Sequence, residues 1–350
     1  MRLGTNPGRR WRKGLQKPWN GIERRGGFNP GMKGYTFVDY ATQAYIGLVG
    51  LLVLLFHNGT VPAWPWFVAG HAAGLALIHW LVTGNKKAQD KLGRTMLGGY
   101  GWKALDFLRH FYPVILYTGL FCETAALNRM FFKDYLDPIV IRWDQRMFGS
   151  QPSVVLMQKM PWLPVSELLY AAYFSYYVMI VGVGIALFLR DRRQFFHYVS
   201  VVSFVFYACY LIYVFVPVIG PMTFFHRAGD YALPPEMQML AGTDSYPNSV
   251  QAGLFYKLMT WIYRVFEAPG AAIPSSHIAV ALCTVWFSFR YLPRIRYPHL
   301  VAAILLCIAT VYCRYHYALD VITGVAAAAV LIPLGNCLYV SRSERSLSTP

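Results

Sequence analysis

The chain has 350 residues, of which 56% are hydrophobic and only 14% are charged, with a formal net charge of +16. Soluble domains carry about 25% charged residues, so this composition excludes an ordinary soluble protein and indicates a polytopic membrane protein. The positive excess is typical of basic loops beside membrane spans, and we expect no nucleic-acid partner. The six cysteines occur singly, without a Cys-x-x-Cys motif, and we expect no metal and no cofactor.

The N-terminal stretch Met1–Thr36 holds nine Lys and Arg residues and lacks helical periodicity. We expect residues 1–36 to form a disordered, basic cytoplasmic tail, which leaves open a contact with anionic lipid headgroups. Residues 37–104 then supply two N-terminal spans and a basic cytoplasmic loop. Residues 105–340 form the main membrane core, and residues 341–350 form a second cytoplasmic tail.

Long apolar runs define the predicted fold class, because roughly 17–25 apolar residues suffice for a helix to cross a bilayer. The sequence predicts an all-α, polytopic membrane helical bundle of about eight spans, with a six-span core after two N-terminal spans. The predicted spans are Phe37–His57, Ala63–Val82, Leu105–Leu127, Leu163–Leu189, Phe195–Ile219, Ser276–Leu292, Pro298–Cys313 and Ala318–Val340.

Two longer connections separate these runs. Asn128–Trp162 is mixed and partly amphipathic, and we expect it at the membrane surface. Gly220–Ile273 is first polar and rich in Pro and Gly, and then contains Val250–Phe266, whose apolar residues recur at helical spacing. We expect this second segment to lie in the plane of the membrane interface.

The distribution of Lys and Arg predicts the orientation. If eight spans alternate, the side that holds the N-terminus carries 22 Lys and Arg residues and the other side carries 9. The richer side is expected to be cytoplasmic. We therefore expect a multi-pass protein of the plasma (inner) membrane, with both termini in the cytoplasm.

Two short motifs lie at span ends on the non-cytoplasmic side. Pro274, Ser275 and Ser276 are typical of a helix start, where free N–H groups bind phosphate, and His277 follows in the first turn. His316 and Asp320 are four residues apart, so the carboxylate can orient the imidazole as a nucleophile.

Arg314 completes this set as a phosphate clamp. The candidate residues are thus His316, His277 and Asp320 for catalysis, and Arg314, Ser275 and Ser276 for phosphate binding. A histidine at a membrane interface is also compatible with a satisfied polar residue. We prefer that interpretation for the histidines outside the motifs, His57, His71, His79, His197 and His299.

Pro-Ser-x-His, followed some 40 residues later by His-x-x-x-Asp, resembles the type-2 phosphatidic acid phosphatase superfamily. The resemblance extends from about Leu105 to Val340. It implies that His316 attacks phosphorus and forms a phosphohistidine, that Asp320 orients His316, and that His277 protonates the departing alcohol. Water or a second alcohol then releases the phosphate.

Two positions depart from the phosphatase branch of that superfamily. Thr310 stands where an arginine is expected, and no basic residue lies in Tyr213–Met222. The Tyr-x-x-x-Pro-x-x-x-Pro pattern of this second segment is more similar to the inositol phosphotransferase (inositol phosphorylceramide synthase-like) branch, which usually has arginine in place of Met222. Arg227 and Arg264 are candidate replacements for the missing cations.

Three functions remain open. The first is a lipid phosphatase or phosphotransferase that acts on a phosphate-containing headgroup at the non-cytoplasmic face, with the motifs favouring transfer. The alternative within this class is a phosphatidic acid or isoprenyl (pyro)phosphate phosphatase that uses water. The second is a catalytically inactive lipid-binding protein of the same fold, and the third, a transporter, lacks an obvious pair of broken helices. Glu123 is either a site residue or an interhelical hydrogen-bond partner.

Overall fold

The computed structural model describes residues 34–92, 96–226, 246–266 and 269–348. The structure is 81% helical, and the described residues contain no strand, so the all-α prediction is confirmed. Nearly all of the predicted N-terminal tail lies outside the described residues. The helices are α2 (Phe37–Phe56), α3 (Trp64–Leu92), α4 (Met96–Leu127), α5 (Asp137–Phe148), α6 (Pro152–Lys159), α7 (Leu163–Arg190), α8 (Arg192–Phe215), α9 (Pro221–His226), α11 (Asn248–Gln251), α12 (Leu254–Phe266), α13 (Ser276–Tyr291), α14 (Arg296–Tyr312) and α15 (Ala318–Ser348).

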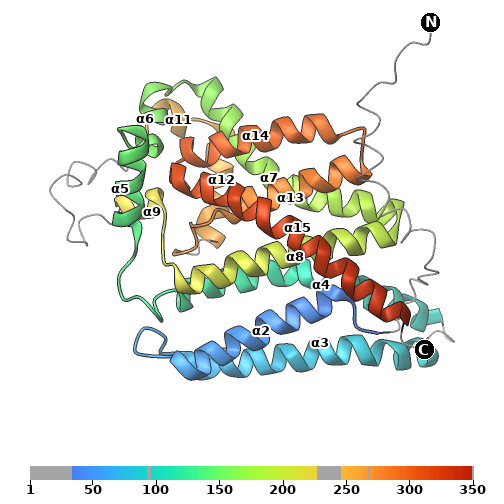
Figure 1. Ribbon diagram of the computed structural model, residues 1–350. Coiled ribbons are helices and arrows are strands. Elements are labelled where there is room, and N and C mark those ends of the chain that lie inside the picture. The colour runs from blue at the N-terminus through green and yellow to red at the C-terminus, as the bar shows by residue number, and fades with distance from the viewer. Residues whose placement is uncertain (1–33, 93–95, 227–245, 267–268, 349–350) are drawn as a thin grey trace, which may run out of the picture.

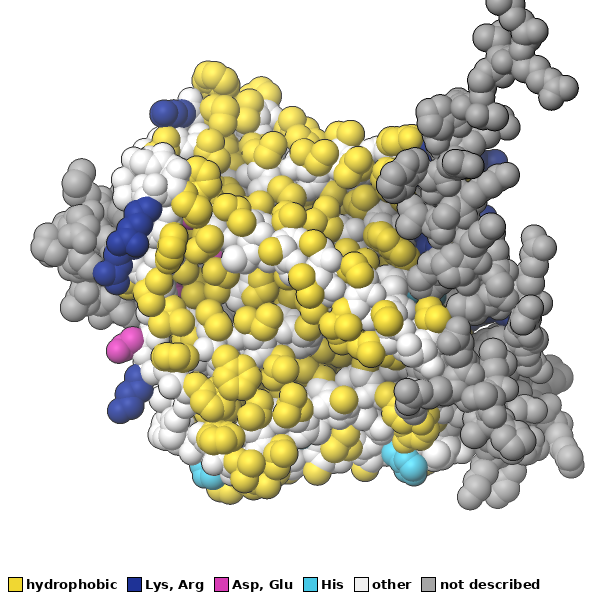
Figure 2. Space-filling view, viewed as in Figure 1, with side chains coloured by type: hydrophobic (Ala, Val, Ile, Leu, Met, Phe, Trp, Pro, Cys, Tyr) yellow, Lys and Arg dark blue, Asp and Glu magenta, His cyan; other side chains and the backbone are white. Residues whose placement is uncertain are grey.

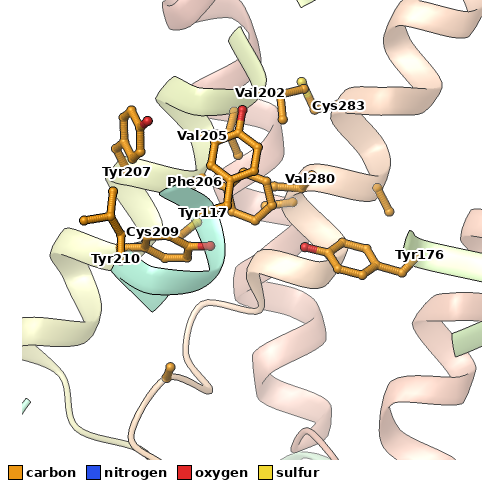
Figure 3. Close-up of a cluster of buried hydrophobic side chains, with 14 of the residues drawn as sticks. Tyr117, Tyr176, Val202, Val205, Phe206, Tyr207, Cys209, Tyr210, Val280 and Cys283 are labelled. Carbon is orange, nitrogen blue, oxygen red and sulfur yellow. The ribbon is translucent and has the colours of Figure 1, made fainter. Parts of the chain in front are cut away.

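Helix α8 is the centre of the bundle (Figure 1). It packs against α2, α4, α7, α13 and α15. Of the residues in its most apolar 18-residue stretch, 72% are buried. Its first turn is stabilised by Asp191, whose side chain accepts a hydrogen bond from the Arg193 amide at 2.8 Å. Tyr207, Cys209 and Tyr210 of α8 meet Tyr117 of α4 and Val280 of α13 in the core (Figure 3). α8 therefore connects the N-terminal helices to the helices that carry the motifs.

The predicted number of spans is wrong. Among the described residues, five helices are long and apolar enough to cross a membrane, and they coincide with the first, second, fourth, fifth and eighth predicted spans. Helices α13 and α14 have only 16 and 17 residues. At 1.5 Å per residue they rise about 24–26 Å, less than the roughly 30 Å of a bilayer's hydrocarbon core. In α4, which has 32 residues, the apolar segment Phe111–Leu127 can be described.

The outer surface agrees with a membrane environment. Hydrophobic side chains cover most of the face in Figure 2, and Lys and Arg side chains lie along its left edge. Exposed apolar residues recur on the candidate spans, among them Leu55, Leu77 and Leu189. A soluble protein rarely exposes so large an apolar area, and the chain is therefore an integral multi-pass membrane protein.

The short helices gather at one end of the bundle. α5, α6, α9 and α11 lie at the left in Figure 1, whereas α15 runs from that end to the opposite one. The predicted surface stretch Asn128–Trp162 contains α5 and α6, and the predicted interfacial segment contains α12. Leu254, Trp261 and Val265 of α12 are more than half exposed, as expected for a helix that lies against lipid.

A buried ion pair joins α2 to α4. Arg109 donates to both oxygens of Asp39, and Tyr112 donates to the same carboxylate at 2.7 Å. Asp39 and Arg109 are almost fully buried. Asp39 also accepts hydrogen bonds from the backbone and side chain of Thr36 at the start of α2. One carboxylate thus caps a helix and neutralises an arginine inside the bundle.

Replacing Arg109 by methionine should lower the free energy of unfolding by about 3–5 kcal/mol, because it leaves the Asp39 carboxylate buried and without its cation. Thermal unfolding in detergent measures the effect. The double variant Asp39→Asn/Arg109→Met should recover part of the loss. Arg129→Met is the control, because Arg129 is exposed. An unchanged unfolding midpoint in Arg109→Met would show that the pair contributes nothing.

Candidate active site

The two motifs meet although about 40 residues separate them. Ser275 is the N-cap of α13 and His277 lies in its first turn, whereas His316 lies in the turn between α14 and α15. Helices α13 and α15 pack closely because Gly324 has no side chain. A Cβ atom at Gly324 would lie 2.8 Å from the Ser275 carbonyl oxygen. The glycine thus permits the approach that brings the motifs together.

The His316 imidazole makes three side-chain contacts. Its Nδ1 lies 3.2 Å from the Asp320 Oδ2, as the four-residue spacing predicts. Its Nε2 lies 3.2 Å from the Ser275 hydroxyl and 3.3 Å from the His277 Nδ1. With Asp320 ionised, its oxygens only accept hydrogen bonds, and Nδ1 of His316 then carries the proton. The lone pair is then on Nε2, which faces His277.

Burial keeps His316 neutral. The ring is 3% exposed, and this desolvation lowers its pKa to about 4, although the Ala272 carbonyl acts in the opposite direction. A neutral imidazole at neutral pH has an available lone pair. The environment of His316 therefore suits a nucleophile.

Ser275 and Ser276 contribute differently. The Ser275 hydroxyl contacts His316, whereas the Ser276 amide donates to the Tyr213 hydroxyl at 3.0 Å. Tyr213 in turn donates to the Pro274 carbonyl at 2.8 Å. Part of the predicted helix N-terminus is thus occupied by a tyrosine of α8, which holds the start of α13 in place.

Arg314 lies beside the motif, but its side chain is not among those that line the cavity next to His316. Its φ angle is 63°, a left-handed conformation that is uncommon outside glycine. Its guanidinium lies over the Tyr246 ring, 5.0 Å from the centroid, and its carbonyl accepts the Met222 amide at 2.9 Å. Its role as a phosphate clamp stays a prediction.

Thr310, Arg264 and Glu123, which were also candidates from the sequence, lie within the described residues. The Thr310 carbonyl accepts the amides of Tyr315 and His316, which closes the turn before α15. Arg264 is exposed on α12, and Arg227 lies outside the described residues. Glu123 pairs with His71 of α3 at 3.0 Å, which supports the interhelical interpretation for Glu123.

A cavity of about 380 Å³ adjoins the two histidines. Ser276, His277 and His316 line one part of it, and the rest of its wall is mostly aromatic and aliphatic, including Tyr176 and Tyr210. Val181 lines it too and is 52% exposed on the outer face of α7. No Lys, Arg, Asp or Glu is among the described residues that line it. The site thus places the two histidines, His277 and His316, beside an otherwise mainly apolar cavity.

The sequence interpretation missed three supporting residues. Tyr213 is one of them, although it was part of the noted tyrosine–proline pattern. Asp137 and Asp144 of α5 are the others, and both are fully buried. Their sequence signal is weak, since two carboxylates seven residues apart in an amphipathic stretch are also typical of an exposed helix face.

Comparison with protein families agrees with the motifs. The profile of the PAP2 superfamily matches residues 139–334, more than half of the chain, and this range includes both histidines and Asp320. The chain therefore belongs to the PAP2 superfamily, a phosphatase superfamily. No curated protein and no solved structure matches the chain.

Proposed function

We propose that this protein is a membrane-embedded lipid phosphotransferase of the PAP2 superfamily in which His316 carries the phosphoryl group. One observation carries the proposal: Nδ1 of His316 is held by Asp320, and Nε2 faces His277 at 3.3 Å. A nucleophile with an orienting group on one side and a proton donor on the other is the arrangement that covalent catalysis requires.

The proposed reaction has two steps. The first step begins with His277 protonated. The Nε2 lone pair of His316 forms a bond to phosphorus as the bond from phosphorus to the leaving alcohol oxygen breaks, and His277 gives that oxygen its proton and becomes neutral. An acceptor hydroxyl then attacks the phosphohistidine while His277 takes up the acceptor's proton. The bond between phosphorus and His316 breaks, and its electron pair returns to Nε2. No net proton is consumed in the two steps.

The cavity supports a lipid substrate. Its wall is aromatic and apolar, and Val181 connects it to the exposed face of α7. Such a chamber suits a hydrocarbon chain, because its wall is as apolar as the lipid around the chain. The phosphate of a substrate whose chain lies there would reach the histidines at the other part of the cavity.

The acceptor is the finer part of the proposal. Thr310 and the pattern Tyr213–Met222 favour the phosphotransferase branch. The alternative within the superfamily is hydrolysis, with water in place of the acceptor alcohol. An apolar chamber that lowers the local water concentration favours an alcohol that binds there.

A second candidate function is lipid binding without turnover. It is favoured by the absence of a Lys or Arg side chain among the described residues of the cavity wall. Phosphoryl transfer develops negative charge that enzymes stabilise with cations or hydrogen-bond donors. If the cavity lacks both during the reaction, the same fold binds a lipid phosphate and releases it unchanged.

The site is proposed to face away from the cytoplasm. The basic junctions between α7 and α8 and between α13 and α14, which lie at the end opposite the start of α13, would then be cytoplasmic. Phe37 at the start of α2 contacts Tyr339 near the end of α15, with ring centroids 6.2 Å apart. The start of α2 and the C-terminal part of α15 therefore lie at the same end, opposite the start of α15.

An assay of the purified protein in detergent tests the proposal. The substrates are phosphatidic acid, phosphatidylinositol and an isoprenyl pyrophosphate. Each is tested with and without an acceptor, which is inositol or a diacylglycerol whose acyl chains differ from those of the donor. We expect a new phosphorylated product that requires an acceptor, with little free phosphate. Phosphate release without an acceptor would identify hydrolysis instead. Saturable binding of phosphatidic acid with no product would favour the binding protein.

A further inference from the structure

Two buried carboxylates of α5 contact the segment that follows His316. Asp137 and Asp144 are seven residues apart, about two helical turns, and so lie on one face of the helix. Both are fully buried, and neither lines the cavity. They accept hydrogen bonds from residues 219–220 before α9 and from residues 317–319, which directly follow His316.

Asp144 caps α15 from a different helix. Its Oδ2 accepts the Ala318 amide and its Oδ1 accepts the Leu319 amide, both at 2.9 Å. These amides belong to the first turn of α15, whose N–H groups have no partner within the helix. A carboxylate is also favourable at this positive end of the helix dipole. Asp144 thus fixes where α15 begins.

Asp137 holds the residue next to His316. Its Oδ1 accepts the Tyr317 hydroxyl at 2.8 Å and the Gly220 amide at 3.0 Å, and its Oδ2 accepts the Ile219 amide at 2.9 Å. Burial raises the pKa of this carboxyl to about 7, although its three hydrogen bonds act in the opposite direction. Asp137 therefore joins the segment before α9 to the turn that carries His316.

The packing between these segments leaves little freedom. Gly220 has a φ angle of 86°, and a Cβ atom there would lie 2.8 Å from the Tyr315 carbonyl oxygen. The turn residues 315–317 are thus enclosed by the segment before α9 on one side and by α5 on another. A displacement of α5 would move the His316 backbone.

The start of α15 also controls the His316 ring. The Asp320 Oδ2 accepts the Tyr317 amide at 2.9 Å and contacts the His316 Nδ1 at 3.2 Å. If α15 began one residue later, Asp320 would not meet the ring in this way. The hydrogen bonds that Asp144 and Asp320 accept at the start of α15 therefore act together to position the His316 ring.

We infer that Asp144 and Asp137 are positioning residues for His316, which hold the turn 315–317 and the first turn of α15 so that the Nε2 of His316 faces His277 and the substrate phosphorus. This inference rests on the proposed function. Helix α5 is then a support for the catalytic turn as well as a surface helix.

The test compares Asp144→Asn and Asp144→Ala with the wild type in full-length protein. Small displacements of a reacting group cost up to about 10²-fold in rate, so Asp144→Ala should lower kcat by about 30–100-fold and change KM by less than about 3-fold. Asp144→Asn keeps one acceptor oxygen, so its kcat should fall less than that of Asp144→Ala. Asp134→Asn is the matched control, because Asp134 lies just before α5 and is exposed.

A second readout is independent of turnover. The amides of Ala318 and Leu319 should exchange hydrogen faster in Asp144→Ala than in the wild type, while exchange in α8 stays unchanged. The inference is overturned if folded Asp144→Ala keeps the wild-type kcat, or if its exchange at both amides is unaltered. If the wild type turns over no lipid phosphate, the proposed function fails, and the exchange rates still decide whether Asp144 holds α15.

Discussion

Replacing His316 by alanine should reduce phosphoryl transfer by at least about 10³-fold, since removal of a covalent nucleophile leaves only the binding contributions to catalysis. The ring lies between Asp320 and His277, and alanine supplies no other lone pair there. The initial rate of product formation with a radiolabelled lipid phosphate measures the effect. Binding of the same lipid should change far less.

His79→Ala is the matched control for this experiment. His79 is exposed on α3, where its Nδ1 contacts the Tyr35 hydroxyl at 2.6 Å, and it lies outside the cavity wall. This variant should keep the wild-type rate. A folded His316→Ala variant with more than about a tenth of the wild-type rate would contradict the assignment of His316 as nucleophile.

Replacing His277 by alanine should lower the rate by about 10²–10⁴-fold with a lipid alcohol as leaving group, the usual contribution of general acid catalysis. An alkoxide is a poor leaving group and needs the proton that His277 would supply. With an aryl phosphate such as p-nitrophenyl phosphate, whose phenolate leaves without a proton, the first step should be affected much less.

The burst of p-nitrophenolate separates these two effects. His277→Ala should retain a burst close to that of the wild type while the later steady-state rate falls, since the acceptor also needs a base. Tyr177→Phe is a control at the cavity wall that leaves both histidines in place. If His277→Ala lowers the burst rate as much as the rate with a lipid, His277 is not the acid that protonates the leaving group.

Much of the site was predictable because its chemistry is local in sequence. A proline–serine pair predicts a helix start, and Ser275 is the N-cap of α13. The spacing of His316 and Asp320 predicts a contact, and the two side chains lie 3.2 Å apart. That the two motifs meet across about 40 residues came from the family resemblance and from the alternation of spans.

The remaining features depend on contacts that sequence spacing does not encode. Asp137 and Asp144 contact residues about 170–180 positions away, with separations of 180 to Tyr317 and 174 to Ala318. The left-handed backbone of Arg314 turns its side chain toward Tyr246, and nothing in its neighbours indicates this. Apolar composition alone also overestimated the spans, because α13 and α14 are apolar but short.

The most direct test of the central claim is to trap the phosphorylated protein. The wild type is incubated with a radiolabelled lipid phosphate without acceptor, quenched in alkali, and digested. On the peptide that contains His316 we expect label that survives alkali and is lost in acid, as a phosphorus–nitrogen bond requires. We expect no label in His316→Ala. Label that survives acid and is lost in alkali, on a peptide with Ser275, would contradict it, as would turnover without any labelled protein.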